Sequence, residues 1–139
     1  MAAMAWKVVK AGLLRKAPLF SRCSRRELAH VASIGYEEEF PARQELTREG
    51  ERGRQFFVLL SGEVTVHKGG TQVATLREGD FFGETALVSH GGRTATVTAT
   101  TPVRALVITD RSFRSLLGRS PSIQAKVLEA LAERLTPSA

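Results

Sequence analysis

The sequence has little that would build a disulfide framework or a membrane span. It contains one cysteine, Cys23, in 139 residues. A lone cysteine cannot form an internal disulfide, so we expect a reducing compartment and a cytoplasmic location. Lys7 and Lys10 interrupt the apolar residues of segment 1–14, which fits an amphipathic helical lead-in better than a signal peptide or a membrane span. These features predict a soluble protein.

Recognisable catalytic and metal-binding constellations are also missing. A metal enzyme with a β-roll of the cupin type needs clustered histidines and a carboxylate. His30, His67 and His90 show no paired spacing. No serine or cysteine nucleophile has a base partner at a recognisable spacing. We therefore expect no enzymatic activity, no metal and no cofactor.

What the sequence does contain is an ordinary globular composition with an excess of positive charge. Hydrophobic residues make up 42% and charged residues 24%, and the formal net charge is +6. The length suits one domain, which we place at residues 1–139. A basic surface attracts nucleic acid, acidic membranes or phosphorylated small molecules, and charge alone does not choose between them.

Both ends of the chain have sequence patterns that predict helices. In the entry segment 1–34, Ser24 and Glu27 have the spacing of a capping box, in which each side chain bonds the other residue's backbone amide. Segment 110–135 predicts two helices, the first capped by Asp110 and ended by Gly118, the second begun by Ser120 and Pro121. The second helix carries one apolar stripe, formed by Ile123, Val127, Leu131 and Leu135.

The middle of the chain, residues 35–109, is typical of short β-strands. Segment 56–60 is an apolar run that predicts a buried strand, and Gly69 and Gly70 predict a tight hairpin. Segment 94–100 alternates small apolar residues with threonines, as a half-buried strand does, and segment 103–108 follows as another strand. Many short strands at close spacing predict a β-sandwich or barrel.

The most unusual segment is 79–87, where a strand ends at Phe82 and a short helix follows. Gly83 permits a sharp turn and a close approach of a ligand to the backbone. The free amides at the start of the helix, with Arg93 nearby, would form an anion site. Glu84 fits such a site if it accepts a hydrogen bond from a neutral hydroxyl such as a ribose 2′-OH. A surface ion pair between Glu84 and Arg93 would explain the same residues.

Segments 82–87 and 93–99 resemble the phosphate-binding cassette of cyclic-nucleotide-binding domains, found in catabolite-type regulators, kinase regulatory subunits and nucleotide-gated channels. Segment 14–20 and Ser24 to Leu28 resemble the helical entry of this family, and segments 49–53 and 61–64 resemble its turns. The resemblance covers about residues 13–135. It implies an eight-stranded antiparallel β-roll (a jelly-roll, cupin-like) with N-terminal helices, a short cassette helix and two C-terminal helices.

The resemblance also implies a binding site around the cassette, residues 82–95. The cyclic phosphate would lie on the amides of Glu84 to Ala86 and on Arg93, and Glu84 would accept from the ribose hydroxyl. The last helix would close as a lid, with Leu128, Leu131 or Leu135 over the base and Arg134 reaching the nucleotide. The expected ligand-binding residues are Phe82, Gly83, Glu84, Thr85, Ala86, Arg93, Thr94 and Ala95, the strand residues Val64, Val66 and Val73 against the base, and Arg134.

The function that follows is sensing of a 3′,5′-cyclic nucleotide. Gly92 stands where many relatives have proline, which loosens the loop but removes no contact group. Thr94 occupies a position at which threonine often accompanies cGMP recognition but also occurs with cAMP, and we favour cAMP. The signal would pass to a protein effector in trans, or the chain would act as a buffer of the nucleotide or as a piece of a longer regulator, and the sequence does not choose between these. We expect a monomer or weak dimer.

Two other functions compete with this interpretation. A DNA-binding regulator would need a helix-turn-helix after the lid, where only Thr136 to Ala139 follow, and the arginines are scattered in sequence rather than set on a basic helix. We therefore expect no DNA-binding domain. A domain that keeps the fold, has lost the nucleotide and binds a protein is the second alternative. Retention of Gly83, Glu84 and Arg93 together argues against it.

Overall fold

The computed structural model describes residues 10–89 and 91–135. Residues 10–14 are helical and lead into the short 3₁₀ helix η1 (Pro18–Phe20) and helix α2 (Arg25–Ser33). Eight strands follow: β1 (Tyr36–Phe40), β2 (Glu45–Thr47), β3 (Gln55–Ser61), β4 (Val64–Lys68), β5 (Thr71–Leu76), β6 (Phe81–Phe82), β7 (Thr96–Ala99) and β8 (Val103–Thr109). The 3₁₀ helix η2 (Glu84–Leu87) separates β6 from β7, and α3 (Asp110–Arg119) and α4 (Pro121–Leu135) end the described chain.

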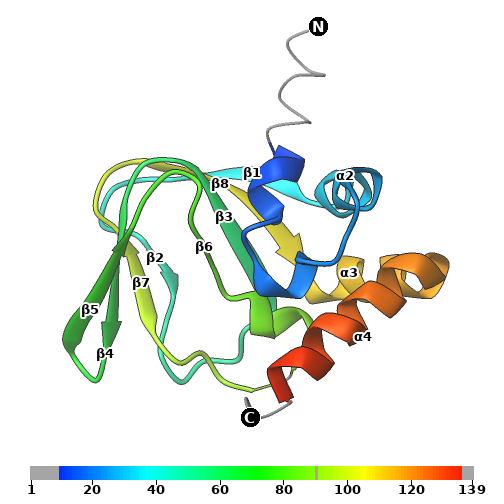
Figure 1. Cartoon of the computed structure of the whole chain (residues 1–139). Coiled ribbons are helices and arrows are strands. Elements are labelled where there is room, and N and C mark those ends of the chain that lie inside the picture. The colour runs from blue at the N-terminus through cyan, green and yellow to red at the C-terminus, as the bar shows by residue number, and fades with distance from the viewer. Residues whose placement is uncertain (1–9, 90, 136–139) are drawn as a thin grey trace, which may run out of the picture.

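The strands form two antiparallel four-stranded sheets, in the orders β1-β8-β3-β6 and β2-β7-β4-β5, which confirms the predicted β-roll. Figure 1 shows the two sheets facing each other, with the β4–β5 hairpin at the end away from the helices. The residues between the sheets alternate along each strand, as half-buried strands require. They include Phe57 and Leu59 of β3, Val97 and Ala99 of β7, and Ala105 and Val107 of β8.

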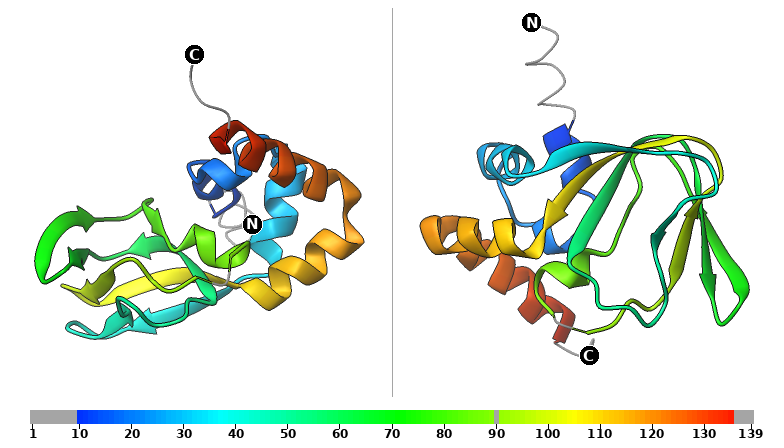
Figure 2. Two further views of the ribbon diagram at one scale, coloured as in Figure 1. Left: turned by 90° about the horizontal axis from the view of Figure 1, so that it is seen from below. Right: turned by 180° about the vertical axis from the view of Figure 1, so that it is seen from behind.

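The helices cover the outer face of the sheet that contains β3 and β8, as both views of Figure 2 show. A second apolar cluster lies there, in which Phe56 and Val58 of β3 pack with Phe20 of η1 and Phe113 of α3. Strand β3 therefore contributes alternate residues to two cores. This explains why segment 56–60 is apolar at every position instead of alternating.

Most local predictions are confirmed. Ser24 and Glu27 form both hydrogen bonds of the capping box. Gly69 and Gly70 have φ values of 57° and 80° and join β4 to β5, as a tight hairpin turn requires. Ser120 accepts from the amide of Ile123 at the start of α4.

Two helix boundaries were predicted wrongly. Thr109, not Asp110, caps α3: its hydroxyl accepts from the amide of Ser112 at 3.1 Å, and Asp110 is the first helical residue. The extended conformation of Thr109, the last residue of β8, places its side chain at the helix start. Gly118 does not end α3, which continues to Arg119.

No helix within the described ranges is both long enough and apolar enough to cross a membrane. Cys23 is buried and unpaired beneath the helical layer.

Candidate functional site

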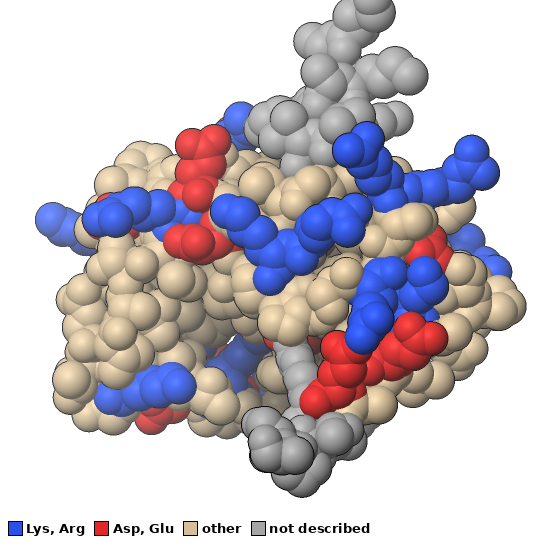
Figure 3. All heavy atoms as spheres, viewed as in Figure 1, with Lys and Arg blue, Asp and Glu red and all other residues tan. Residues whose placement is uncertain are grey.

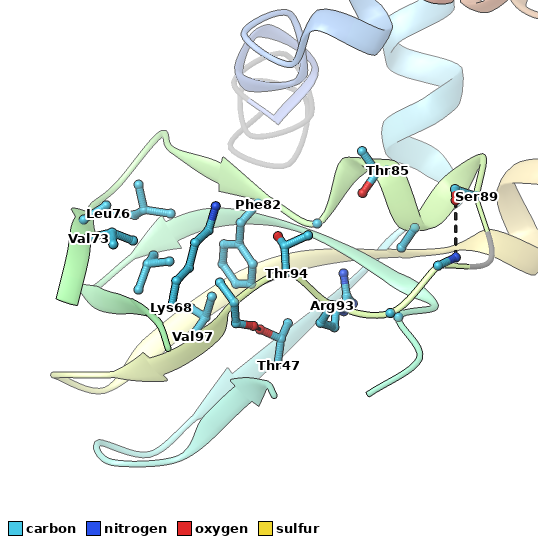
Figure 4. A pocket seen from close by; sticks show the side chains of 18 residues that line it. Thr47, Lys68, Val73, Leu76, Phe82, Thr85, Ser89, Arg93, Thr94 and Val97 are labelled. Atoms are coloured by element: carbon cyan, nitrogen blue, oxygen red, sulfur yellow. Dashed lines mark hydrogen bonds between the residues drawn. The ribbon is translucent and has the colours of Figure 1, made fainter. Parts of the chain in front are cut away.

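A cavity of about 520 Å³ lies between the β4–β5–β7 side of the roll and the turn from β6 into η2. Figure 4 shows its side chains converging from these elements, and Figure 3 shows the molecule hollowed beside the roll, with blue arginine or lysine atoms inside the hollow. The lining residues are Thr47, Gly53, Val66, Lys68, Val73, Ala74, Leu76, Phe82, Gly83, Thr85, Ala86, Ser89, Gly91, Gly92, Arg93, Thr94, Ala95 and Val97. The cavity therefore brings together most of the predicted site residues.

Gly83 shapes the turn that opens the cassette. Its φ of 81° is left-handed, a region that glycine enters without strain. A Cβ atom here would come within 2.6 Å of Nη1 of Arg93 and 2.9 Å of the carbonyl oxygen of Gln55. A glycine is thus required both by the backbone conformation and by the close approach of the arginine.

The predicted short helix after Gly83 is a single 3₁₀ turn, η2. The amide of Ala86 donates to the carbonyl of Gly83 at 3.1 Å, so it is already engaged in this conformation. Thr85 and Ala86 both line the cavity, and Ala86 is buried against the roll. The turn therefore borders the cavity as predicted, and the Ala86 amide would have to exchange its partner to meet a phosphate.

Arg93 supplies the positive charge of the cavity. Its backbone is fixed by two hydrogen bonds, from its amide to Glu51 and from Gly50 to its carbonyl, at 2.7 and 2.8 Å. Its Nη2 donates to the carbonyl oxygen of Gln55 at 2.6 Å, and its guanidinium lies 5.9 Å from the ring centre of Phe57. Burial lowers the pKa of this guanidinium, because desolvation disfavours the charged form. A half-buried arginine held in a cavity wall can bind a phosphate through two parallel hydrogen bonds.

Glu84 does not line the cavity. Its Oε2 accepts a hydrogen bond from the backbone amide of Leu19 in η1 at 3.2 Å. Its role as acceptor for a ribose hydroxyl stays a prediction, and that role would require the carboxylate to turn from η1 toward the cavity.

The far end of the cavity is apolar, as predicted for contact with a base. Val66 and Val73 line it, and Val73 is 53% exposed at the open side. Val64 was placed there wrongly. It is fully buried between the sheets, where it pairs with Leu76 and Ala99, and β4 contributes Val66 and Lys68 to the cavity wall instead.

Sequence reasoning missed several lining residues, of which Lys68, Thr47 and Ser89 have polar side chains. Lys68 shares the face of β4 with Val64 and Val66, so the strand alternation could have indicated it. In Figure 4 its side chain extends across the apolar end between Val73 and Phe82. Thr47 is 8% exposed and donates to the carbonyl of Ala95 at 3.0 Å, which holds the start of β7. No local pattern marks this contact between distant segments.

The expected lid helix, α4, lies against η1 and α3 in this structure. Polar contacts tie it to the N-terminal segment: Ser122 donates to Glu27, Lys126 lies 3.7 Å from Glu27, and Arg22 pairs with Glu133. Leu128 is 59% exposed, and no described side chain of α4 lines the cavity. The side chains of Arg134 and Leu135, two predicted lid contacts, lie outside the described residues.

Comparison with known proteins identifies relatives of both the sequence and the fold. The sequence model of the family described as "Cyclic nucleotide-binding domain" matches residues 37–120. A cAMP-dependent protein kinase regulatory subunit of Hypocrea atroviridis is 33% identical over 76% of this chain, and a cGMP-dependent protein kinase of Caenorhabditis briggsae is 32% identical over 76%. The N-terminal domain of a transcriptional regulator from Streptomyces coelicolor A3(2) has a TM-score of 0.81 at 28% identity, covering 88% of this chain and 91% of that one.

The chain spans only part of the curated kinase proteins that it matches. It covers 23% of the Hypocrea regulatory subunit and 15% of the Caenorhabditis kinase. The similarity therefore concerns one domain of those proteins.

Proposed function

The chain belongs to the family of cyclic nucleotide-binding domains, and on that premise we propose that its cavity senses cAMP, which it binds in preference to cGMP. The observation that carries the proposal is the position of Arg93. Its guanidinium lies in the wall of a cavity whose other end is apolar, beside the glycine turn of the cassette. This arrangement pairs an anion site with a base site at the two ends of one cavity.

The preference for cAMP rests on the apolar end of the cavity. Val66, Val73, Ala74, Leu76 and Val97 offer contact area but no side-chain hydrogen bonds. Guanine carries more polar groups on its edges than adenine, so it loses more on entering such surroundings. Thr94 and Lys68 are polar groups that act in the opposite direction, which makes the ratio of the two affinities the quantity to measure.

We further propose that nucleotide binding moves α4 over the cavity as a lid. The helix would pivot at Ser120, directly after α3. It is held away from the cavity by the buried side chains of Ile123 and Val127 and by polar contacts such as those of Lys126 and Glu133. The exposed pair of Arg22 and Glu133 is worth little individually, and a ligand can offset the other contacts only through interactions that it makes with the helix in its moved position. A ligand that gains contacts with the lid can therefore shift this equilibrium, and the moved helix would pass the signal to a protein partner.

The proposed role is binding without turnover, by a regulatory module that is not an enzyme and needs no cofactor. After prolonged incubation with the protein, cAMP should be recovered unchanged by chromatography. Appearance of 5′-AMP in proportion to protein would overturn this part of the proposal.

Calorimetric titration with cAMP and then cGMP tests the main proposal, with 5′-AMP as the control for a noncyclic phosphate. One-to-one binding with the tighter constant for cAMP is expected. At about 100 times the dissociation constant, ligand should raise the unfolding free energy by about 2.7 kcal/mol. Absence of heat and of stabilisation with both cyclic nucleotides would favour the alternative, a protein-interaction module that keeps the fold alone.

The lid is tested separately by spin labels on two exposed positions, Leu128 of α4 and Gln72 of β5, in a variant whose Cys23 is replaced by alanine. Saturating cAMP should shift the distance distribution between the labels. An unchanged distance distribution with ligand bound would contradict the proposed movement of α4 but not the proposed binding site.

A further inference from the structure

Four arginines that are scattered in sequence meet in one groove next to the nucleotide cavity. The basic groove is a depression of about 360 Å³ lined by Arg52, Arg54, Asp110, Arg111 and Arg114. It continues into a second depression of about 500 Å³ that shares Arg52, Arg54, Asp110 and Arg111, and whose wall also includes Arg93. The side chain that we assign to the phosphate thus borders both the cavity and this second depression, which adjoins the basic groove.

The pairing of two strands builds the groove. Gln55 at the start of β3 lies opposite Thr109 at the end of β8, and the amide of Asp110 donates to the carbonyl of Arg54 at 2.8 Å. The loop before β3 and the first turn of α3 are therefore fixed side by side. Arg111 and Arg114, three residues apart, share one side of that helix.

The lining of the groove contains more arginines than carboxylates. All four arginines are exposed, and Asp110 is the single carboxylate among the described residues of the lining. The Asp110 Oδ1 atom accepts from the backbone amide of Arg111 at 2.8 Å. Some arginines elsewhere lie beside carboxylates, as Arg77 does with Glu63 at 3.0 Å and Arg104 with Glu37 at 2.5 Å, whereas Arg25 and Arg26 of α2 form no ion pair with a described residue. Within the described ranges, neither Arg54 nor Arg111 forms such an ion pair.

We propose that the basic groove docks an acidic segment of a partner protein. Guanidinium groups bind carboxylates through paired hydrogen bonds, and a cluster of like charges is relieved when an anionic segment occupies it. The inference does not depend on nucleotide binding. It identifies the basic groove as the surface at which a separate partner protein would bind.

The lining favours a peptide over a nucleic acid. Asp110 lies among the arginines and Glu51 in the adjoining depression, where the evenly spaced phosphates of a nucleic acid would meet them. A peptide can place carboxylates at the arginines and neutral residues beside Asp110. Among the residues that the structure describes, no aromatic side chain lines either depression, so these linings offer no surface on which bases could stack.

Binding of a short fluorescein-labelled polyglutamate peptide, followed by fluorescence anisotropy, tests the proposal. The groove variant combines Arg54→Glu with Arg111→Glu. The matched control combines Arg25→Glu with Arg26→Glu on exposed positions of α2 and changes the net charge equally. The groove variant should lose about tenfold or more in affinity, equivalent to about 1.4 kcal/mol, and the control should lose far less.

Equal losses in the two variants would show attraction to net charge alone and would overturn the proposal. So would stronger binding of a short DNA duplex that depends on the same two arginines, since that outcome assigns the groove to nucleic acid. If the glutamate variant does not fold, Arg54→Gln with Arg111→Gln removes the charges without reversing them. A cAMP titration of each variant keeps failure of the groove distinct from failure of the nucleotide site.

Discussion

The carboxylate of Glu84 accepts a hydrogen bond from the backbone amide of Leu19, which joins the cassette turn to η1 across the sequence. The same helix η1 packs against α4. A nucleotide whose ribose draws Glu84 toward the cavity would break the bond to Leu19 and loosen the support of α4. Ligand recognition and lid movement would then both depend on the side chain of Glu84.

Replacement of Glu84 by alanine tests the ribose role. The variant should weaken cAMP binding much more than binding of its 2′-deoxy analogue, because only cAMP carries the hydroxyl that Glu84 is predicted to accept. It should also lower the unfolding free energy by about 0.5–1.5 kcal/mol through loss of the bond to Leu19. Calorimetry with the two ligands and denaturant unfolding measure the two effects.

Glu84→Gln separates these effects. The amide oxygen of glutamine can still accept from Leu19, so stability should stay close to that of the unchanged protein. It can also accept from the ribose hydroxyl, but without the charge of the carboxylate, so cAMP binding should weaken less than in Glu84→Ala. If both variants lose affinity equally for cAMP and 2′-deoxy-cAMP, the ribose role of Glu84 is excluded.

Arg93→Ala should abolish measurable nucleotide binding while the protein remains folded. Truncating one partner of a desolvated charge pair costs about 2–5 kcal/mol, which corresponds to a loss of about 30-fold or more. Calorimetry measures the loss, and circular dichroism checks the fold. Arg25→Ala, on the exposed side of α2, removes the same charge and should bind normally. Retained affinity in Arg93→Ala would mean that the phosphate lies elsewhere.

Gly83→Ala should damage both the turn and the site. A left-handed backbone costs an alanine about 1–2 kcal/mol, and the added methyl group would push the Arg93 guanidinium from its place. Gly118→Ala is the control, since a Cβ there meets nothing within 4 Å. Because alanine favours a helix, the control should gain about 0.5–1 kcal/mol. Thermal unfolding and cAMP titration measure both variants, and equal behaviour would contradict the assignment of Gly83.

The sequence predicted what depends on near neighbours. The capping box, the Gly69–Gly70 hairpin and the alternation in β7 are each set by residues a few positions apart, and each is present. The cassette could be located because Gly83 and Arg93 lie close in the chain.

Features that depend on long-range packing were not predictable in the same way. Val64 and Val66 are the same residue type on the same face of β4. Only the position of the opposite sheet decides that Val64 belongs to the core and Val66 to the cavity wall. The bond from Leu19 to Glu84 joins segments 65 residues apart. The basic groove likewise exists only because β3 and β8 pair, which brings Arg54 beside Arg111.

Acid should weaken the contact between α2 and α4. The pKa of Glu27 is lowered from its ordinary value of 4.5, chiefly by the hydrogen bond from Ser122 and then by the amide of Ser24. A carboxylate with a lowered folded pKa stabilises the fold above its unfolded pKa, and this contribution is lost as the pH falls through the folded pKa. The unfolding free energy should therefore decline as the pH drops below 4.5.

Glu27→Gln should be less stable than the unchanged protein at neutral pH, and the difference should shrink across that acid window. Denaturant unfolding at several pH values measures it. Glu38→Gln, on the exposed side of β1, removes the same charge outside the contact. A stability difference for Glu27→Gln that stays constant with pH would contradict the assignment.

Lys68→Met should raise the preference for cAMP over cGMP. Lys68 has only hydrogen-bond donors and lies at the apolar end of the cavity, where a base would bind. Guanine presents two neighbouring acceptors, O6 and N7, whereas adenine sets an amino donor beside N7. The ammonium can therefore assist guanine more than adenine, and methionine keeps the apolar stem without the charge. Loss of one such hydrogen bond is worth about 1.5–3 kcal/mol with a charged donor, so cGMP affinity should fall by about tenfold or more while cAMP affinity changes little.

Calorimetry with both ligands measures the ratio, and Lys16→Met, which does not line the cavity, controls for net charge. Equal losses for the two nucleotides would place Lys68 near the phosphate instead, since that group is common to both.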